Sequence, residues 1–260
     1  MTGIVKAVIN FIRDFLRKKL HYKSEDLPYY ITIAAAVIMF VLGLGAFVGL
    51  TEQLVEDELT GFDAAVTAEV VGWREEGLTQ FLTFITHVGD STGYFVVIAV
   101  FIVLLIVRRR SWKFIFQTGV VLLLATLSNV VLKQIINRAR PDADHLVVVH
   151  SLSYPSGHAM SAMAFYGFLI FLTARYKMNY VLKVILILVF ASLIFLIGLS
   201  RVYLGVHFPS DVIAGYIGGL IWVTFCAIVF DVIVLYRRRR ERAGEILAIL
   251  KDNAKSKEND

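Results

Sequence analysis

The sequence predicts an all-α polytopic membrane protein, in which a bundle of six transmembrane helices follows an N-terminal amphipathic helix. The 260-residue chain is 58% hydrophobic and has a mean hydropathy of +0.71, well above the values of soluble domains. Its apolar residues fall in runs long enough to cross the hydrocarbon core of a bilayer. Short clusters of basic residues separate several of these runs, as in cytoplasmic membrane loops.

Residues 1–28 are predicted to form a cytoplasmic segment whose helix lies on the membrane surface. Apolar residues recur there at helical spacing and alternate with lysine and arginine. A cleavable signal peptide would carry an uninterrupted apolar stretch instead. The apolar positions are Ile4, Val8, Phe11, Ile12 and Phe15.

The six predicted spans make up one membrane domain over residues 29–236. Residues 237–260 follow as a basic and then polar cytoplasmic tail. The spans are Tyr29–Leu50, Thr92–Val107, Phe114–Gln134, His158–Thr173, Tyr180–Leu199 and Val212–Tyr236.

The distribution of lysine and arginine predicts the orientation of these spans. The basic clusters are the N-terminal segment, Arg108–Arg110 with Lys113, Arg175 with Lys177, and Arg237–Arg240. By contrast, the connection after the first span is acidic, with Arg74 as its lone basic residue. We therefore expect both termini in the cytoplasm and the acidic connection outside. The basic pI of about 9.3 and the absence of extra luminal domains suggest a bacterial plasma membrane.

The acidic connection also carries apolar residues, which favour one or two helices lying at the membrane interface. A solvated loop with a few packing residues is the alternative. These apolar residues are Phe62, Val66, Val70, Trp73, Leu78, Phe81 and Phe84.

Three polar motifs stand at the predicted outer ends of the third to sixth spans. In the first, Lys133 and Arg140 are two helical turns apart, which predicts one shared helix face, and Pro141 is expected to end the helix. Two fixed cations at a helix end suit a multiply charged anion such as phosphate. Snorkelling to lipid headgroups is the alternative, but basic residues on the outer side run against the usual charge bias.

The second motif is Ser156-Gly157-His158, directly before the fourth run. Ser156 and Gly157 are expected to begin a helix, where backbone N–H groups and the helix dipole favour an anion. His158 would stand beside that anion as a group able to transfer a proton near neutral pH. A capped helix start with an incidental histidine is the alternative.

The third motif runs from Ser200 to Asp211. Pro209 suits a helix start, which places Asp211 in the first turn, within reach of His207. A carboxylate on one ring nitrogen fixes the tautomer and leaves the other nitrogen as a nucleophile. Arg201 adds a third cation to the same outer layer.

With these spacings the chain resembles the type 2 phosphatidic acid phosphatases, which are metal-independent membrane lipid phosphatases. The resemblance implies that His207 attacks phosphorus to form a phosphohistidine, that Asp211 orients His207, and that His158 protonates the departing lipid oxygen. It implies that the phosphate is bound by Lys133, Arg140, Ser156, Gly157 and Arg201.

The predicted reaction is hydrolysis of a lipid phosphate at the outer membrane face, and phosphatidylglycerophosphate is the favoured substrate. Undecaprenyl diphosphate, phosphatidate and diacylglycerol diphosphate are alternative substrates. A non-catalytic lipid-binding protein on the same fold, and a transporter that uses Asp231, are alternatives of other classes. The expected partners are membrane lipids, with no nucleic acid and no obligatory protein partner. With Cys226 as the single cysteine and no carboxylate cluster, no metal and no cofactor are expected.

Overall fold

The computed structural model describes residues 10, 26–90, 92–97, 99, 112–142, 145–148 and 151–258, with side chains up to residue 245. Within these residues the chain is helical and has no strand, as the sequence predicts. The helices are α2 (Leu27–Val55), α3 (Thr60–Gly72), α4 (Glu76–Val88), α6 (Lys113–Ile136), α7 (Gly157–Arg175), α8 (Tyr180–Tyr203) and α9 (Pro209–Glu258).

Five of the described helices are long and apolar enough to cross a membrane: α2, α6, α7, α8 and α9. They coincide with the first, third, fourth, fifth and sixth predicted spans. Most of the predicted second span and nearly all of the N-terminal amphipathic segment lie outside the described residues, so six spans and a surface helix stay predictions. The membrane-spanning class itself is confirmed.

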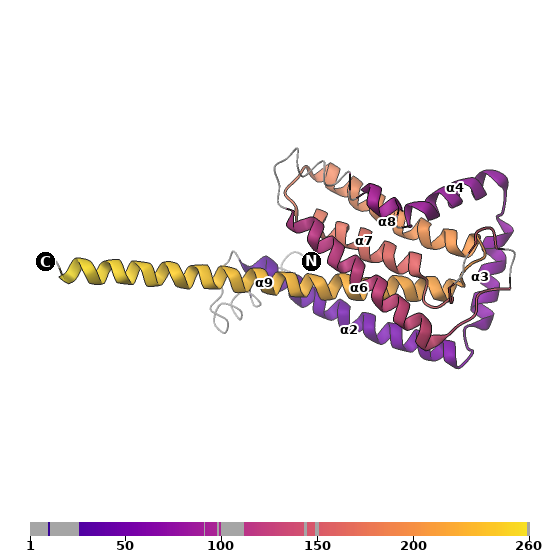
Figure 1. Ribbon diagram of the computed structural model, residues 1–260, viewed down its shortest axis with the longest axis horizontal. Coiled ribbons are helices and arrows are strands. Elements are labelled where there is room, and N and C mark those ends of the chain that lie inside the picture. The colour runs from indigo at the N-terminus through magenta and orange to yellow at the C-terminus, as the bar shows by residue number, and fades with distance from the viewer. Residues whose placement is uncertain are drawn as a thin grey trace. The chain divides into compact units, whose positions relative to one another are not determined.

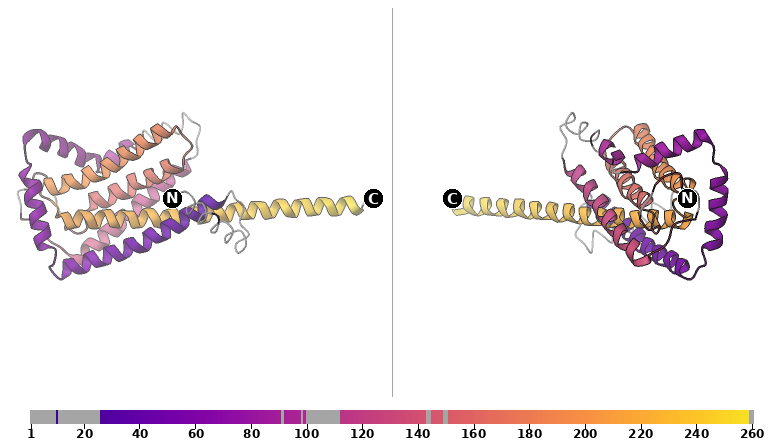
Figure 2. Two further views of the ribbon diagram at one scale, coloured as in Figure 1. Left: turned by 180° about the vertical axis from the view of Figure 1, so that it is seen from behind. Right: turned by 45° about the vertical axis from the view of Figure 1, so that its right-hand side comes forward.

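The chain divides into two compact units, and residues 40–223 form the larger one. In this unit α7 packs against α6 on one side and α8 on the other, while α4 and α3 also contact α8. Figure 1 shows α6, α7 and α8 side by side, and Figure 2 shows the same packing from behind. The core contains the side chains of Tyr94, Phe165, Tyr166 and Ile197.

The outer face of α8 shows why this unit belongs in a membrane. Ile185, Leu188 and Phe195 are 50%, 60% and 62% exposed, although they are large and apolar. Exposed apolar side chains repeated along a helix would be costly in water, but in a bilayer they contact lipid tails.

Close packing of α9 on α7 depends on glycines. A Cβ atom built on Gly215 would lie 2.6 Å from the carbonyl oxygen of Ser156, and one on Gly219 would lie 2.5 Å from that of Met160. Small residues allow helix backbones to approach this closely in membranes, where tight packing is a main source of helix association. This contact fixes the position of the N-terminus of α7, where the second motif lies.

Replacing Gly219 with valine is therefore expected to destabilise the larger unit by several kcal/mol, since the added atoms overlap backbone. Thermal unfolding of detergent-purified protein measures this effect. The matched control is Gly119→Val on α6, because an added Cβ at Gly119 meets nothing within 4 Å. Equal unfolding temperatures for the two variants would contradict this account of the packing.

The smaller unit comprises residues 1–39 and 224–260. Asp26, just before α2, accepts hydrogen bonds of 2.6 and 3.1 Å from the guanidinium of Arg242. Arg238 lies over the ring of Tyr29 at 4.9 Å. The hydrogen bond and charge of Arg242 outweigh burial and lower the pKa of Asp26, so the pair stays ionic near neutral pH.

The acidic connection forms two helices, α3 and α4. Val70 and Leu82 are buried in the core of the larger unit, whereas Phe62, Phe81 and Phe84 are 44%, 48% and 65% exposed. The acidic connection is therefore helical and packed, unlike a solvated loop, and its location at the membrane interface stays a prediction.

Candidate active site

The turn between α8 and α9 places His207 next to Asp211. After α8 ends at Tyr203, the chain turns at Gly205, whose φ of 77° lies in the left-handed region that favours glycine. Because α9 begins at Pro209, Asp211 falls in its first turn. Asp211 Oδ2 lies 3.3 Å from His207 Nδ1, so the predicted contact is present. The second ring nitrogen, Nε2, lies 3.4 Å from Nη1 of Arg140.

Several donors besides His207 converge on the Asp211 carboxylate. Arg138 Nη1 donates to Oδ1 at 2.6 Å, and the backbone N–H of Phe208 donates to Oδ2 at 2.8 Å. Ser153 Oγ also donates to Oδ2. These contacts compensate the buried negative charge and fix the carboxylate in one orientation.

His207 is only 2% exposed, and this burial decides its charge. Burial lowers the pKa of His207 well below its ordinary range, against the opposing hydrogen bond and charge of Asp211; the nearby cations Arg140 and Arg201 lower it further. The imidazole is therefore neutral near pH 7. With Nδ1–H donated to Asp211, the lone pair of Nε2 is available for attack.

This lowered pKa predicts that the protein loses stability in mild acid. In the unfolded chain His207 takes up a proton below its ordinary pKa of 6.5, whereas in the folded chain it does not. Lowering the pH from 6.5 to 5 should therefore favour unfolding by about 1.5 kcal/mol through this group. Melting temperatures at pH 7 and 5 test this, and the uncharged variant His207→Asn should show a weaker pH dependence. Equal pH dependence in both proteins would refute the assignment.

Lys133 and Arg140 do not share a helix face, contrary to the sequence prediction. Helix α6 ends at Ile136 because Asn137 takes a left-handed conformation (φ 52°, ψ 37°), which closes the helix before Pro141 can do so. The loop after α6 nevertheless brings both cations to the same backbone segment, residues 151–152. Lys133 Nζ donates to the carbonyl of Leu152, and Arg140 Nε donates to that of Ser151 at 2.6 Å.

Both cations make further contacts in the loop. Arg140 also donates through Nη1 to the carbonyl of Val206, at 2.5 Å, and through Nη2 to Ser151 Oγ, at 3.0 Å. A guanidinium has five N–H donors and an ammonium has three. Arg140 Nη2 also reaches the carbonyl of Leu152, and Lys133 Nζ that of Ser153, both at 3.5 Å. The loop contacts therefore orient Lys133 and Arg140 beside His207 Nε2, and an anion bound there would replace the longest of these contacts.

Ser156 and Gly157 begin α7, as predicted, and Ser156 Oγ caps the helix by accepting from the Ala159 N–H. The prediction that the Ser156 N–H points at an anion is wrong. It donates to the backbone carbonyl of Asp211 at 2.9 Å and so links the starts of α7 and α9. The N–H groups of Gly157 and His158, in the first turn, have no acceptor within the helix and remain suited to an anion.

Arg201 is buried on α8, with an exposed fraction of 3%. Its Nη1 donates to Thr86 Oγ1 of α4 at 2.7 Å. Its Nε has no hydrogen-bond partner among the residues that the structure describes. A buried guanidinium with an uncommitted donor is costly unless something else binds it.

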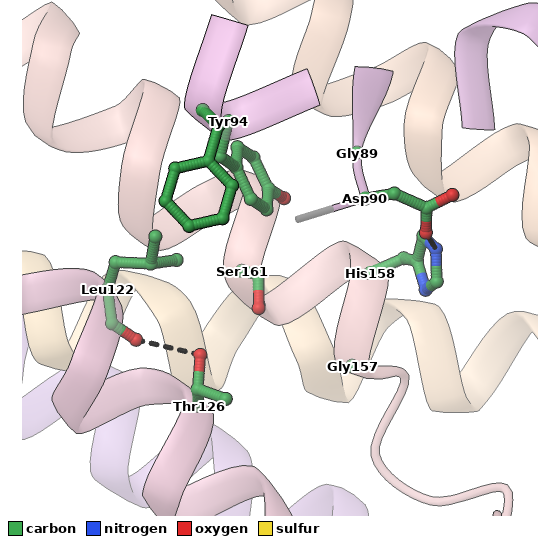
Figure 3. A pocket seen from close by; sticks show the side chains of 9 residues that line it. Gly89, Asp90, Tyr94, Leu122, Thr126, Gly157, His158 and Ser161 are labelled. Carbon is green, nitrogen blue, oxygen red and sulfur yellow. Dashed lines mark hydrogen bonds and ion pairs between the residues drawn. The ribbon is translucent and has the colours of Figure 1, made fainter. Parts of the chain in front are cut away.

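His158 lies on α7 and pairs with a carboxylate that the sequence reasoning missed. His158 Nε2 is 2.5 Å from Asp90 Oδ1, and His87 Nδ1 is 2.9 Å from Asp90 Oδ2. Figure 3 shows Asp90 and His158 facing each other at one side of a cavity of about 270 Å³, with Leu122 and Thr126 of α6 at another. The cavity is also lined by Gly89, Tyr94, Phe95, Gly157 and Ser161.

Asp63, which pairs with Arg138, is another functional candidate that sequence reasoning missed. The guanidinium of Arg138 bridges the carboxylates of Asp63 and Asp211 at 2.7 and 2.6 Å. Asp63, on α3, also accepts from the N–H and hydroxyl of Ser210 at 2.9 and 2.6 Å. The sequence offers no local signal for Asp63, since α3 also contains Glu69 and the connection around it is rich in carboxylates.

No group of three or more histidine, cysteine, aspartate or glutamate side chains gathers as a potential metal site among the described residues. The charge facing an anion here comes from lysine, arginine and backbone N–H groups. Metal independence stays a prediction of the resemblance.

Comparison with known proteins supports the resemblance. A family model for the PAP2 superfamily matches residues 112–234. The chain is 36% identical to phosphatidylglycerophosphatase B of Bacillus subtilis (strain 168) over 171 residues, 61% of this chain and 78% of that protein. It is 27% identical to undecaprenyl-diphosphatase of Sulfolobus acidocaldarius over 153 residues, 58% of this chain and 69% of that protein.

The fold matches a solved structure of the same kind. The crystal structure of a transmembrane PAP2-type phosphatidylglycerolphosphate phosphatase from Bacillus subtilis superposes with a TM-score of 0.66 and 31% identity, covering 75% of this chain and 95% of the other. The chain therefore belongs to the PAP2 superfamily and is a membrane lipid phosphatase.

Proposed function

We propose that the chain hydrolyses phosphatidylglycerophosphate through a phosphohistidine on His207, without a metal ion. The observation that carries this proposal is the position of His207 Nε2. That nitrogen belongs to a neutral imidazole held by Asp211, and it faces the guanidinium of Arg140. A nucleophile directed at an anion-binding group is the arrangement that attack on a phosphate ester requires.

In the first step His207 Nε2 attacks the phosphorus, and the bond from phosphorus to the lipid oxygen breaks. His158 gives its proton to that oxygen, so phosphatidylglycerol leaves as an alcohol. In the second step water attacks the phosphorus, and His158 takes a proton from that water. The bond from phosphorus to His207 Nε2 breaks, so inorganic phosphate leaves and the neutral imidazole of His207 is restored. The phosphate oxygens are bound by Lys133, Arg140, Arg201, the Ser156 side chain and the N–H groups at the start of α7.

The choice of phosphatidylglycerophosphate is supported by a relative and a solved structure that carry this activity in their names. Undecaprenyl diphosphate is the second candidate, because a more distant relative is named for it. A non-catalytic lipid-binding protein would be expected to lack the nucleophile or its cations, and this chain has both.

Phosphate release from a panel of lipid phosphates tests the substrate. Detergent-purified protein is expected to have its highest kcat/KM with phosphatidylglycerophosphate, and lower values with undecaprenyl diphosphate, phosphatidate and diacylglycerol diphosphate. The same rates are expected with a chelator present. A preference for undecaprenyl diphosphate would overturn the substrate assignment, and inactivation by the chelator would overturn metal independence.

We also propose that the site faces outward and that both termini are cytoplasmic, on the strength of the charge distribution. Glu58 and Arg240 are both exposed, which makes them a matched pair for labelling. In a Cys226→Ser background, a membrane-impermeant thiol reagent added to intact cells should label Glu58→Cys but not Arg240→Cys. The reverse pattern would invert the orientation.

A further inference from the structure

The two histidines of the site need opposite charges at the start of the reaction. His207 must be neutral to attack, whereas His158 must carry a proton to give. Each is paired with one carboxylate, Asp211 or Asp90. The surroundings of these two carboxylates therefore decide how strongly each one favours a positively charged imidazole.

The carboxylate of Asp211 is compensated by a cation. Arg138 donates to it at 2.6 Å, and Phe208 N–H and Ser153 add neutral donors. The distance to His207 Nδ1 is 3.3 Å, long for a charge-assisted hydrogen bond. Asp211 is thus placed to orient a neutral imidazole.

The carboxylate of Asp90 has a different environment. Its partners among the described side chains are two histidines, His158 at 2.5 Å and His87 at 2.9 Å. Burial opposes its ionisation, but the hydrogen bonds from His158 and His87 outweigh it and lower the pKa of Asp90 to about 2. Asp90 is therefore an anion whose negative charge stabilises protonated histidines, whereas that of Asp211 is compensated by an arginine.

We propose that Asp90 is a positioning residue for the reaction, whose carboxylate stabilises the protonated form of His158 and directs its Nδ1–H at the departing lipid oxygen. A carboxylate only accepts hydrogen bonds, so Nε2 of His158 carries a proton toward Asp90. The transferred proton is then the one on Nδ1. This inference rests on the proposed function and adds a residue outside the three motifs.

The proton and electron balance of the step is simple. As the bond from His207 Nε2 to phosphorus forms, the electron pair of the breaking bond moves to the lipid oxygen, which takes the proton from His158 Nδ1. His158 becomes neutral and keeps its Nε2–H on Asp90. Among the described residues, the lining of the cavity beside Asp90 and His158 does not include His207, Lys133 or Arg140, and the proposal places the departing lipid there.

Other charges also face His158. Burial disfavours a charged His158, as do Arg201 on α8 and Arg140 in the loop after α6, whereas the hydrogen bond and the charge of Asp90 favour it. The α6 residues that line the same cavity, Leu122 and Thr126, are uncharged. Without the charge of Asp90, His158 would face two cations and no compensating anion. His158 would then lose its proton at a lower pH than in the wild type.

The test compares wild type with Asp90→Asn, which keeps the shape and removes the charge, on two substrates. With phosphatidylglycerophosphate, kcat/KM is expected to fall by about 10- to 100-fold, within the range of general-acid effects. With p-nitrophenyl phosphate it should change by less than about threefold, because nitrophenolate leaves without a proton. The basic limb of the pH profile of kcat/KM for the lipid should move to lower pH, and Asp90→Glu should restore part of the activity.

Glu76→Gln, the loss of an exposed carboxylate at the start of α4, is the matched control and should behave as wild type. Equal losses on both substrates with an unshifted pH profile would show that Asp90 is only structural and would overturn the proposal. Unchanged activity in Asp90→Asn would overturn it as well. Inactivity of the wild type toward every lipid phosphate would instead refute the proposed function, so the two failures are distinguishable.

Discussion

Replacing His207 with alanine is expected to lower kcat for lipid phosphate hydrolysis by about 10⁴- to 10⁶-fold, the range for loss of a catalytic nucleophile. Among the described residues, the hydrogen-bond partner of His207 Nε2 is the guanidinium of Arg140, which cannot act as a nucleophile in its place. The cations would still bind phosphate, so KM should change far less than kcat. Steady-state rates with saturating phosphatidylglycerophosphate measure this loss.

The matched control is His145→Ala. His145 is another histidine of the loops near the site, and its ring contacts the carbonyl of Pro141 at 3.0 Å. It is expected to retain most of the wild-type activity. Comparable losses in both variants would show that the rate depends on loop structure and not on His207 as the nucleophile.

Replacing Arg138 with methionine is expected to destabilise the larger unit by about 3–5 kcal/mol, as is typical when one partner of a buried ion pair is removed. The side chains of Asp63 and Asp211 are 2% and 0% exposed, and Arg138 joins them. Methionine fills similar volume but leaves two buried carboxylates facing each other without a cation. A fall in melting temperature of about 10 °C or more is the expected readout.

A second substitution distinguishes charge from packing. Adding Asp63→Asn to Arg138→Met removes one of the two uncompensated charges, so part of the lost stability should return. If the double variant is no more stable than Arg138→Met, the bridge contributes through packing, including the contact of Arg138 with the Phe208 ring at 4.1 Å. Wild-type stability in the single variant would contradict the account of the network.

The sequence best predicts those features that depend on residues close together along the chain, namely helices and short-range contacts. Apolar runs predict α6, α7, α8 and α9 because a bilayer requires long continuous helices. The contact between His207 and Asp211 follows from four-residue spacing across a helix start. The same local reasoning failed at Lys133 and Arg140, because spacing alone does not show that Asn137 ends the helix between them.

The missed residues are those that reach the site from distant parts of the chain. Asp90 and His158 are 68 residues apart, and Asp63 and Ser210 are 147 apart. Neither acidic residue has a local pattern that distinguishes it from the other carboxylates of the outer connection. Only the packing of α3 and α4 against α8 brings them to the ends of α7 and α9.

The central claim, a phosphohistidine on His207, is tested most directly by trapping the phosphoenzyme. Wild-type protein is mixed with phosphatidylglycerophosphate labelled in its terminal phosphate, quenched with alkali within milliseconds, digested, and sequenced by mass spectrometry. The account predicts acid-labile, alkali-stable phosphate on the peptide that contains His207, and none in His207→Ala. Label on another residue, or rapid turnover of lipid phosphate by His207→Ala, would contradict it.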